Sequence, residues 1–143
     1  MAIQQISVFV QNEKGALNDV LKVLADANVE IRALSIADTK DFGILRLITD
    51  NNSKAELALA ENHYVSTETA VIGAEVADRP GGLSALIDTL AKRDIEVEYL
   101  YAFVASSKEL AYVVLRVNDN AAAEAVLLEN GIELLTEDDI ANI

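Results

Sequence analysis

Cysteine is absent from this chain, and proline, methionine and histidine occur once each. Without cysteine the protein has no disulfide, no thiolate nucleophile and no cysteine-based metal site. Long apolar runs are also missing: none approaches the roughly 20 residues that a membrane-spanning helix needs, and the N-terminus has no basic-then-apolar signal pattern. We therefore expect no membrane partner and, by default, a cytoplasmic location.

Basic residues are scarce as well. Lys and Arg together number 11 against 24 Asp and Glu, which gives a formal net charge of −13. Such a charge repels phosphate backbones, and no cluster of basic residues with interleaved aromatics offsets it. We therefore expect no nucleic-acid partner, and the plain interpretation of the charge is solubility.

Patterns that carry catalysis or bind metals are missing too. The one histidine, His63, falls at the predicted end of a helix and has no evident partner. The chain has no phosphate-binding Gly-rich loop, no zinc-protease motif, no nucleophile elbow and no EF-hand spacing. The sequence therefore predicts no catalytic residue, no metal ligand and no cofactor.

What the chain does have is an internal repeat. Residues 10–17 (VQNEKGAL) return as residues 76–83 (VADRPGGL). The further matches at the same offset are Leu24, Ala25 and Glu30 with Leu90, Ala91 and Glu96. A repeat of roughly 70 residues is too long for a solenoid and predicts two small domains in tandem, residues 1–70 and 71–143. Such a pair creates a seam between the domains, where small ligands tend to bind.

Both halves show the same order of structural patterns. In the first half, an alternating strand pattern precedes a helical one, followed by β-rich segments 29–37 and 43–49, a second helix and a short strand at 65–69. The β-rich segments of the second half are 95–104, 110–117 and 133–135. The order β-α-β-β-α-β, occurring twice, predicts an α+β fold of two ferredoxin-like units. Their antiparallel sheets are expected to join edge to edge, with the helices on one face.

The ends of the helices are marked by residues that favour caps and left-handed exits. The predicted exits are Asn28, Asp94, Gly131 and the Asn62-His63 pair. The predicted N-terminal caps are Ser53, in a capping box with Glu56, and Asn120.

Two segments, residues 12–31 and 78–97, resemble ACT domains. Each runs from a polar residue through a glycine, a small residue and a leucine into a helix and then a strand of the Val-Glu-Ile type. The chain is similar to small free-standing tandem ACT proteins that have no attached catalytic domain. This resemblance implies regulation by a small molecule, usually an amino acid, bound at the seam between paired ACT domains. The two loops differ in sequence, so the two sites need not be equivalent.

The two loops supply the candidate ligand-binding residues. These are Asn12, Glu13, Lys14, Gly15, Ala16 and Leu17 in the first loop, and Asp78, Arg79, Pro80, Gly81, Gly82 and Leu83 in the second. Glycine lets the backbone turn sharply and approach a ligand, and the N–H groups of the following helix favour a carboxylate. The side chains of Asn12 and Asp78 or loop carbonyls can accept hydrogen bonds from an α-ammonium group. Alternatively, Asn12 and Asp78 cap the turn or helix, and the glycines serve only chain reversal.

Tyr99 and Tyr101 are further candidates because they fall on one face of a strand. The resemblance implies that this strand, 95–103, lies beside strand 29–36 across the seam. Their hydroxyl groups are then able to reach a ligand. The alternative is that both tyrosines pack in the sheet with their hydroxyl groups in water.

The strands are apolar on both faces, although a sheet with helices on one side and water on the other should alternate cleanly. Residues of opposite parity, such as Leu47 and Ile48, are both apolar. We therefore expect the second face to be partly covered, and a homodimer is the simplest cover.

Three functions remain open. The first is a non-catalytic regulator that senses an amino acid at the seam and acts on a partner protein. The second is a ligand-independent module for protein interaction or dimerisation. The third, a small ferredoxin-like enzyme using carboxylates and tyrosines, lacks a recognisable catalytic constellation.

Overall fold

The computed structural model describes residues 2–38, 41–104 and 110–143. The first six elements are β1 (Ile3–Gln11), α1 (Ala16–Asp26), β2 (Ile31–Asp38), β3 (Phe42–Thr49), α2 (Asn52–Glu61) and β4 (Ser66–Ala77). The remaining elements are α3 (Gly82–Ala91), β5 (Val97–Ala102), β6 (Leu110–Val117), α4 (Asn120–Glu129), β7 (Leu134–Leu135) and α5 (Glu137–Asn142). No helix among these described residues is long and apolar enough to cross a membrane.

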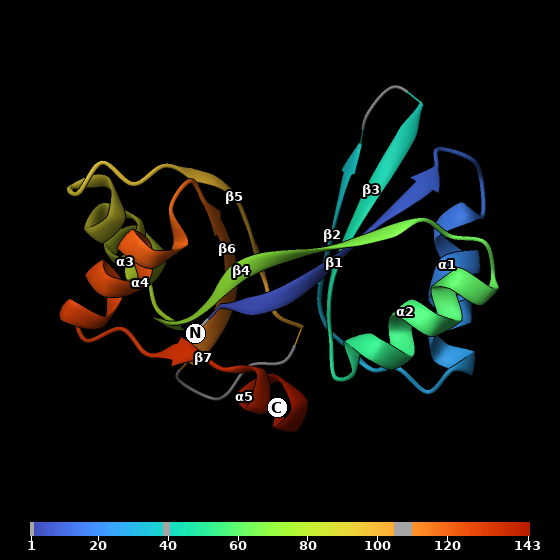
Figure 1. Ribbon diagram of the computed structural model, residues 1–143. Coiled ribbons are helices and arrows are strands. Elements are labelled where there is room, and N and C mark those ends of the chain that lie inside the picture. Colours follow the sequence, from blue (N-terminus) through green and yellow to red (C-terminus); the bar gives the residue numbers. More distant parts are fainter. Residues whose placement is uncertain (1, 39–40, 105–109) are drawn as a thin grey trace.

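One strand, β4, belongs to both halves of the molecule (Figure 1). Its first part pairs with β1, from Val8 with Ser66 to Ile3 with Val71. From Ile72 onward β4 pairs instead with β6, and it also pairs with the short strand β7. The seven strands form one antiparallel sheet in the order β2-β3-β1-β4-β6-β5, with β7 beside β4. The predicted boundary between residues 70 and 71 therefore falls inside a continuous strand, where the pairing partner changes.

The predicted fold class is confirmed. The two β-α-β-β-α-β units, called the first and second unit below, share β4 and place α1 to α4 on one face of a curled sheet. Figure 1 shows one helix pair at each end of the molecule, with the strands between them. In the first unit, α1 and α2 cover a core that includes Ile6, Leu24 and Leu59. In the second, α3 and α4 cover an equivalent core around Leu90 and Leu115.

The helix exits were predicted correctly, whereas the caps were not. Asn28, His63, Asp94 and Gly131 all have a left-handed backbone, with φ between 55° and 73°. The N-terminal cap of α2 is Asn51, whose side chain accepts a hydrogen bond from the Lys54 N–H at 3.1 Å. The cap of α4 is Asp119, which accepts from the Ala122 N–H. In both helices an Asx residue just upstream of the predicted cap fulfils the role, because its backbone is still extended.

The inner face of the sheet is covered within the chain. A third core joins the two units and comprises Ile3, Ala33, Ile48, Val71, Tyr101, Phe103, Val114, Leu135 and Ile140. Strands β2 and β5 meet at its edge, where Ala33 bridges Phe103 and the Val104 N–H donates to the Arg32 carbonyl at 2.8 Å. The expected contact between these strands is therefore confirmed at one bridge. Part of the apolar second face, from which a homodimer was inferred, is covered by the other half of the same chain.

The helix α5 lies beyond the last segment predicted from the sequence, residues 133–135. The helix begins with a capping box between Thr136 and Asp139, and Ile140 is buried in the third core. Arg32 of the first unit is also buried and donates to the carbonyls of Ile140 and Ala141, each at 3.0 Å. A cation at a helix C-terminus is favourable, so this contact attaches the end of the chain to the first unit.

Candidate functional site

The two glycine loops have the same backbone turn. Gly15 and Gly81 have φ values of 86° and 85° and stand at the N-terminal caps of α1 and α3. Neither helix has a side-chain cap, so Asn12 and Asp78 do not cap these helices. A Cβ atom on Gly15 or Gly81 would meet nothing within 4 Å. Glycine is needed at both positions for its positive φ, since other residues adopt this conformation only with strain.

The two loops lie at opposite ends of β4. The first loop follows β1, whose Phe9 N–H donates to the Val65 carbonyl just before β4 begins. The second loop follows Ala77, where β4 ends. Twelve residues of extended strand separate these ends, and at about 3.3 Å per residue that corresponds to tens of ångströms. The two glycine turns of one chain therefore do not frame a single pocket.

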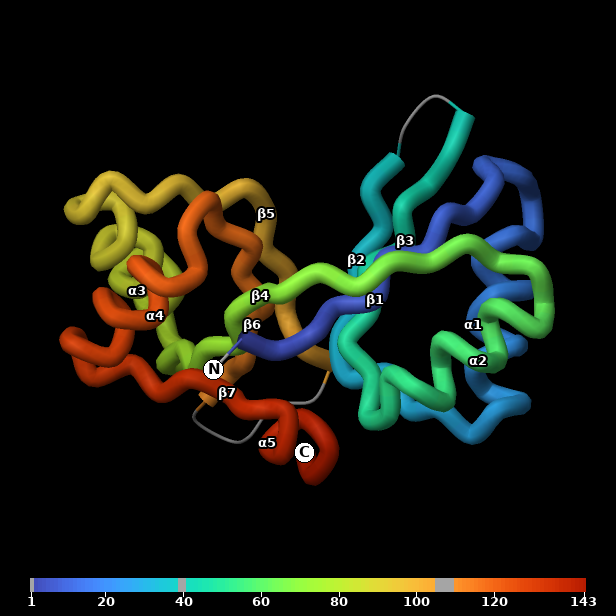
Figure 2. The backbone as a smooth tube through the Cα atoms, viewed as in Figure 1, coloured from blue at the N-terminus to red at the C-terminus, as the bar shows by residue number. Residues whose placement is uncertain are grey.

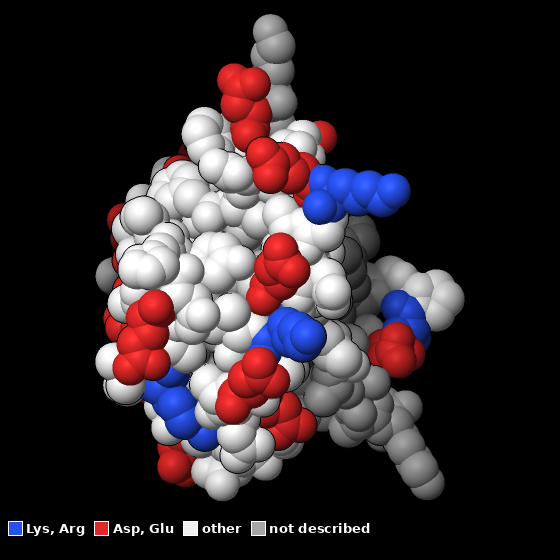
Figure 3. Space-filling model, turned by 90° about the vertical axis from the view of Figure 1, so that its right-hand side faces the viewer, with Lys and Arg blue, Asp and Glu red and all other residues white. Residues whose placement is uncertain are grey.

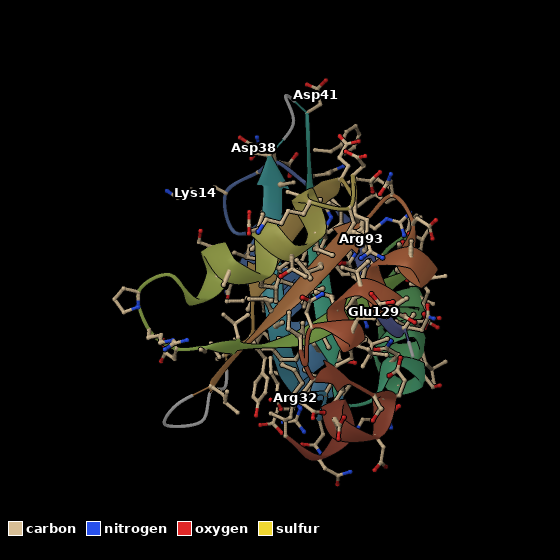
Figure 4. All side chains as sticks on the ribbon, turned by 90° about the vertical axis from the view of Figure 1, so that its left-hand side faces the viewer. Lys14, Arg32, Asp38, Asp41, Arg93 and Glu129 are labelled. Carbon is tan, nitrogen blue, oxygen red and sulfur yellow. The ribbon has the colours of Figure 1, made fainter. Side chains whose placement is uncertain are left out.

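The first loop instead adjoins a crevice within its own unit, called the α1 crevice below. It has a volume of about 150 Å³ and lies between the loop, the start of α1 and the ends of β2 and β3. It is lined by Val10, Gln11, Asn12, Glu13, Leu17, Ile36, Asp38, Gly43 and Leu45. Within it, the Asn12 side-chain amide donates to the Asp38 carboxylate at 3.1 Å. In Figure 4, Lys14, Asp38 and Asp41 lie in the upper part of the view, and Arg32 lies near the bottom, beside α5.

A wider groove of about 360 Å³ lies on the other side of the same loop. It is lined by Phe9, Val10, Gln11, Glu13, Lys14, Ala16, Asp19, Phe42, His63, Tyr64 and Val65. Phe9, Phe42 and Val65 are each about half exposed or more, so these apolar side chains of the groove are in contact with solvent.

The predicted loop residues thus have different surroundings. Asn12, Glu13 and Leu17 line the α1 crevice, and Lys14 and Ala16 line the wider groove. In the second loop, Asp78, Arg79, Pro80, Gly81 and Leu83 are exposed at the surface, and Gly82 is half-buried. The crevice residues that the sequence analysis missed are Ile36, Asp38, Gly43 and Leu45 from β2 and β3. A glycine inside an otherwise apolar strand, as at Gly43, was the one available signal.

Tyr99 and Tyr101 lie in the contact between the units rather than at either loop. The Tyr101 hydroxyl donates to Gln5 Oε1 at 2.6 Å, and Gln5 Nε2 donates to the Tyr99 hydroxyl oxygen at 2.8 Å. Gln5 on β1 is fully buried, and Tyr101 is 7% exposed. The Arg46 guanidinium lies 3.8 Å from the centre of the Tyr99 ring. Burial raises the pKa of Tyr101 well above its usual value, so this hydroxyl stays protonated.

Charged side chains do not form a basic patch on the end of the molecule that carries α1 and α2. Figure 3 shows acidic and basic groups interspersed there on a largely uncharged surface. Among the described residues, no group of three or more His, Asp or Glu side chains is placed to hold a metal ion.

Comparison with known proteins decides the family. A family model described as an ACT domain pair matches residues 1–143. The chain belongs to the ACT domain pair family. This is a family of regulatory, ligand-binding domains of a non-catalytic type, and the resemblance inferred from the two loops is confirmed.

Solved structures agree with this assignment. A protein from Bacteroides thetaiotaomicron is 34% identical, with a TM-score of 0.92 over 100% of this chain and 98% of the other. The regulatory subunit of aspartate kinase from Thermus thermophilus is 16% identical, with a TM-score of 0.66 over 90% of each chain. At that identity the likeness concerns the ACT pair fold alone. A search of curated proteins finds no match.

The Gln5 contact between the units predicts a loss of stability when one donor is removed. Tyr101→Phe leaves Gln5 Oε1 buried without its donor, which should lower the free energy of unfolding by about 1–3 kcal/mol in urea denaturation. Tyr112→Phe is the control, since the Tyr112 hydroxyl has no hydrogen bond within the described residues, and a change within about 0.5 kcal/mol is expected. Equal losses in both variants would contradict this account.

Neighbouring glycines of the second loop should respond differently to alanine. Gly81→Ala places a Cβ in open space, so only the positive φ is penalised, by about 1–2 kcal/mol. At Gly82 a Cβ would overlap the Ala77 carbonyl oxygen, so the start of α3 must move and the loss should be larger. Urea midpoints of the two variants measure this difference. A Gly81→Ala loss as large as that of Gly82→Ala would show that space, not φ, selects glycine at position 81.

Proposed function

We propose that this ACT pair protein is a non-catalytic regulator that binds an amino acid in the α1 crevice. The observation that carries the proposal is the combination of a glycine turn, an uncapped helix start and two carboxylates around one small apolar space. These groups match the three parts of an amino acid. The proposal places the ligand within the first unit rather than at a seam between the two units.

The start of α1 suits the ligand's carboxylate. The N–H groups of Leu17 and Asn18 have no hydrogen-bond partner in the part of the chain that the structure describes. Unpaired amides at a helix N-terminus, together with the helix dipole, favour a negative group. Lys14, on the other side of the same loop, adds a positive charge nearby.

The acidic residues of the crevice suit the ligand's ammonium group. The carboxylates of Glu13 and Asp38 both line it, and Asn12 holds Asp38 through its side-chain amide. Carboxylates accept charge-assisted hydrogen bonds from an ammonium group, and these are stronger than neutral ones. A zwitterion therefore finds a partner for each of its charges within a few residues.

Strand β2 offers a route from the ligand to the rest of the molecule. Ile36 and Asp38 line the crevice, while Arg32 and Ala33 on the same strand contact the second unit and α5. A ligand shifts a conformational equilibrium only by binding one state more tightly than another. Ligand contacts at one end of β2 change the contact between the two units at its other end. A partner protein then responds to that change. We place this activity in the cytoplasm.

A second candidate function rests on the wider groove. Its exposed apolar side chains, Phe9, Phe42 and Val65, resemble a surface that a protein covers. A homodimer formed there would make the chain an interaction module that needs no ligand.

A thermal-shift screen against the twenty amino acids separates these two functions. An amino acid present at 100 times its dissociation constant adds about 2.7 kcal/mol to the stability of the folded state. For a chain of this length the melting temperature should rise by about 5–10 °C. No shift with any amino acid, together with a dimer in light scattering, would favour the interaction module over the regulator.

A further inference from the structure

The strand register allows the α1 crevice to be compared position by position with the second unit. Val10 pairs with Gly43 in the first unit, and Val76 pairs with Ala111 in the second. Ala111 therefore occupies the position of Gly43. By the same reasoning Ala102, which pairs with Val113, occupies the position of Ile36, which pairs with Leu45.

Among the described residues of the second unit, the position that matches Asp38 is not acidic. Asp38 pairs with Gly43. The Phe103 N–H donates to the Tyr112 carbonyl, so the next residue, Val104, falls opposite Ala111 and takes the place of Asp38. The Val104 N–H is bonded to the Arg32 carbonyl, which fixes this end of β5 against the first unit. Figure 2 shows that the corresponding ends of β2 and β3 project away from the second unit.

We propose that the α1 crevice takes an amino acid with an aliphatic side chain, and that the described residues of the second unit form no equivalent site. This inference rests on the proposed function and specifies its ligand. One chain accordingly binds one ligand.

The walls of the crevice determine the class of side chain. Besides Gly43, the residues facing the ligand's side chain are the aliphatic Val10, Leu17, Ile36 and Leu45. Leu17 and Ile36 are 37% and 49% exposed, so a ligand would cover apolar surface that water now contacts. Burial of the ligand's CH₂ groups is favourable, whereas a charged side chain would lose its hydration without a partner among these four residues.

The volume of the crevice limits the size of the ligand's side chain. A cavity of about 150 Å³ is already occupied by one benzene molecule. A crevice of about that volume, open to solvent at Leu17 and Ile36, suits a branched chain of three or four carbons better than an aromatic ring. Valine, leucine and isoleucine fit this limit.

Gly43 gives the sharpest means of testing the proposal. A Cβ added there would lie 3.7 Å from the Val10 carbonyl oxygen and 3.8 Å from Ile36 Cγ2, which are ordinary contacts. The sheet therefore accepts a side chain at this position without a backbone shift. Glycine inside a strand is unfavourable for stability and often marks a place where a ligand approaches the backbone. A larger side chain here fills the crevice and leaves the fold in place.

Isothermal titration calorimetry with free L-valine, L-leucine and L-isoleucine tests the ligand class, with L-phenylalanine, L-lysine and L-aspartate as comparisons. We expect the three aliphatic amino acids to bind at one molecule per chain, at least tenfold more tightly than the others. Tightest binding of a charged or aromatic amino acid would overturn the aliphatic assignment and leave the proposed function standing. Binding of none of these six, together with no shift in the thermal screen of all twenty amino acids, would overturn both.

Gly43→Val and its counterpart Ala111→Val test the location. Gly43→Val should weaken L-leucine binding at least tenfold, whereas Ala111→Val, the same side chain at the matching position, should leave it unchanged. Gly43→Ala serves if the valine variant does not fold, as judged by its circular dichroism. The reverse pattern, or a stoichiometry of two per chain, would overturn the claim that the second unit has no site.

Asp38→Asn provides an independent check. It keeps the shape of the crevice and the chance of a contact with Asn12 but removes the negative charge that faces the ammonium group. We expect at least a tenfold loss of L-leucine affinity and no change in the circular dichroism spectrum. Unchanged affinity would contradict the proposed contact between Asp38 and the ligand's ammonium group.

Discussion

The continuous hydrogen bonding of β4 is the constraint on which the rest of the structure depends. Because its first part pairs with β1 and its second with β6, the two ferredoxin-like units cannot be arranged independently. The shared strand curls the sheet so that its inner face closes on itself around the third core. It also holds the two glycine loops at its opposite ends, and this separation assigns each loop to its own unit.

Duplication has therefore produced two units with one fold and different edges. At the end of β5, Phe103 and Val104 are bound to β2 of the first unit. At the matching end of β2, Ile36 and Asp38 remain open to solvent and line the α1 crevice. The short helix α5 adds to this difference, because Arg32 holds it against the first unit. One copy thus forms the contact between the units while the other remains open to a ligand.

Local signals in the sequence were sufficient for the units but not for the site. Gly15 and Gly81 adopt the predicted turn, and Asn28 and Asp94 end their helices, because each depends only on the backbone preferences of a few residues. The internal repeat then predicted the order of strands and helices along the chain. The crevice depends on Asp38 and Gly43, which come next to Asn12 only through strand register, and no spacing along the chain reveals that.

The same limit explains the other errors. Helix α5 is stabilised by Arg32, which lies 108 residues before Ile140 in the sequence, so neighbouring residues do not reveal the contact that holds it. The apolar inner face suggested a second copy, because the sequence does not show that one half covers the other.

The account is tested most directly by amide chemical-shift mapping with L-leucine. Shifts centred on residues 11–18 and 36–45 are expected, and shifts centred on residues 78–83 would contradict it.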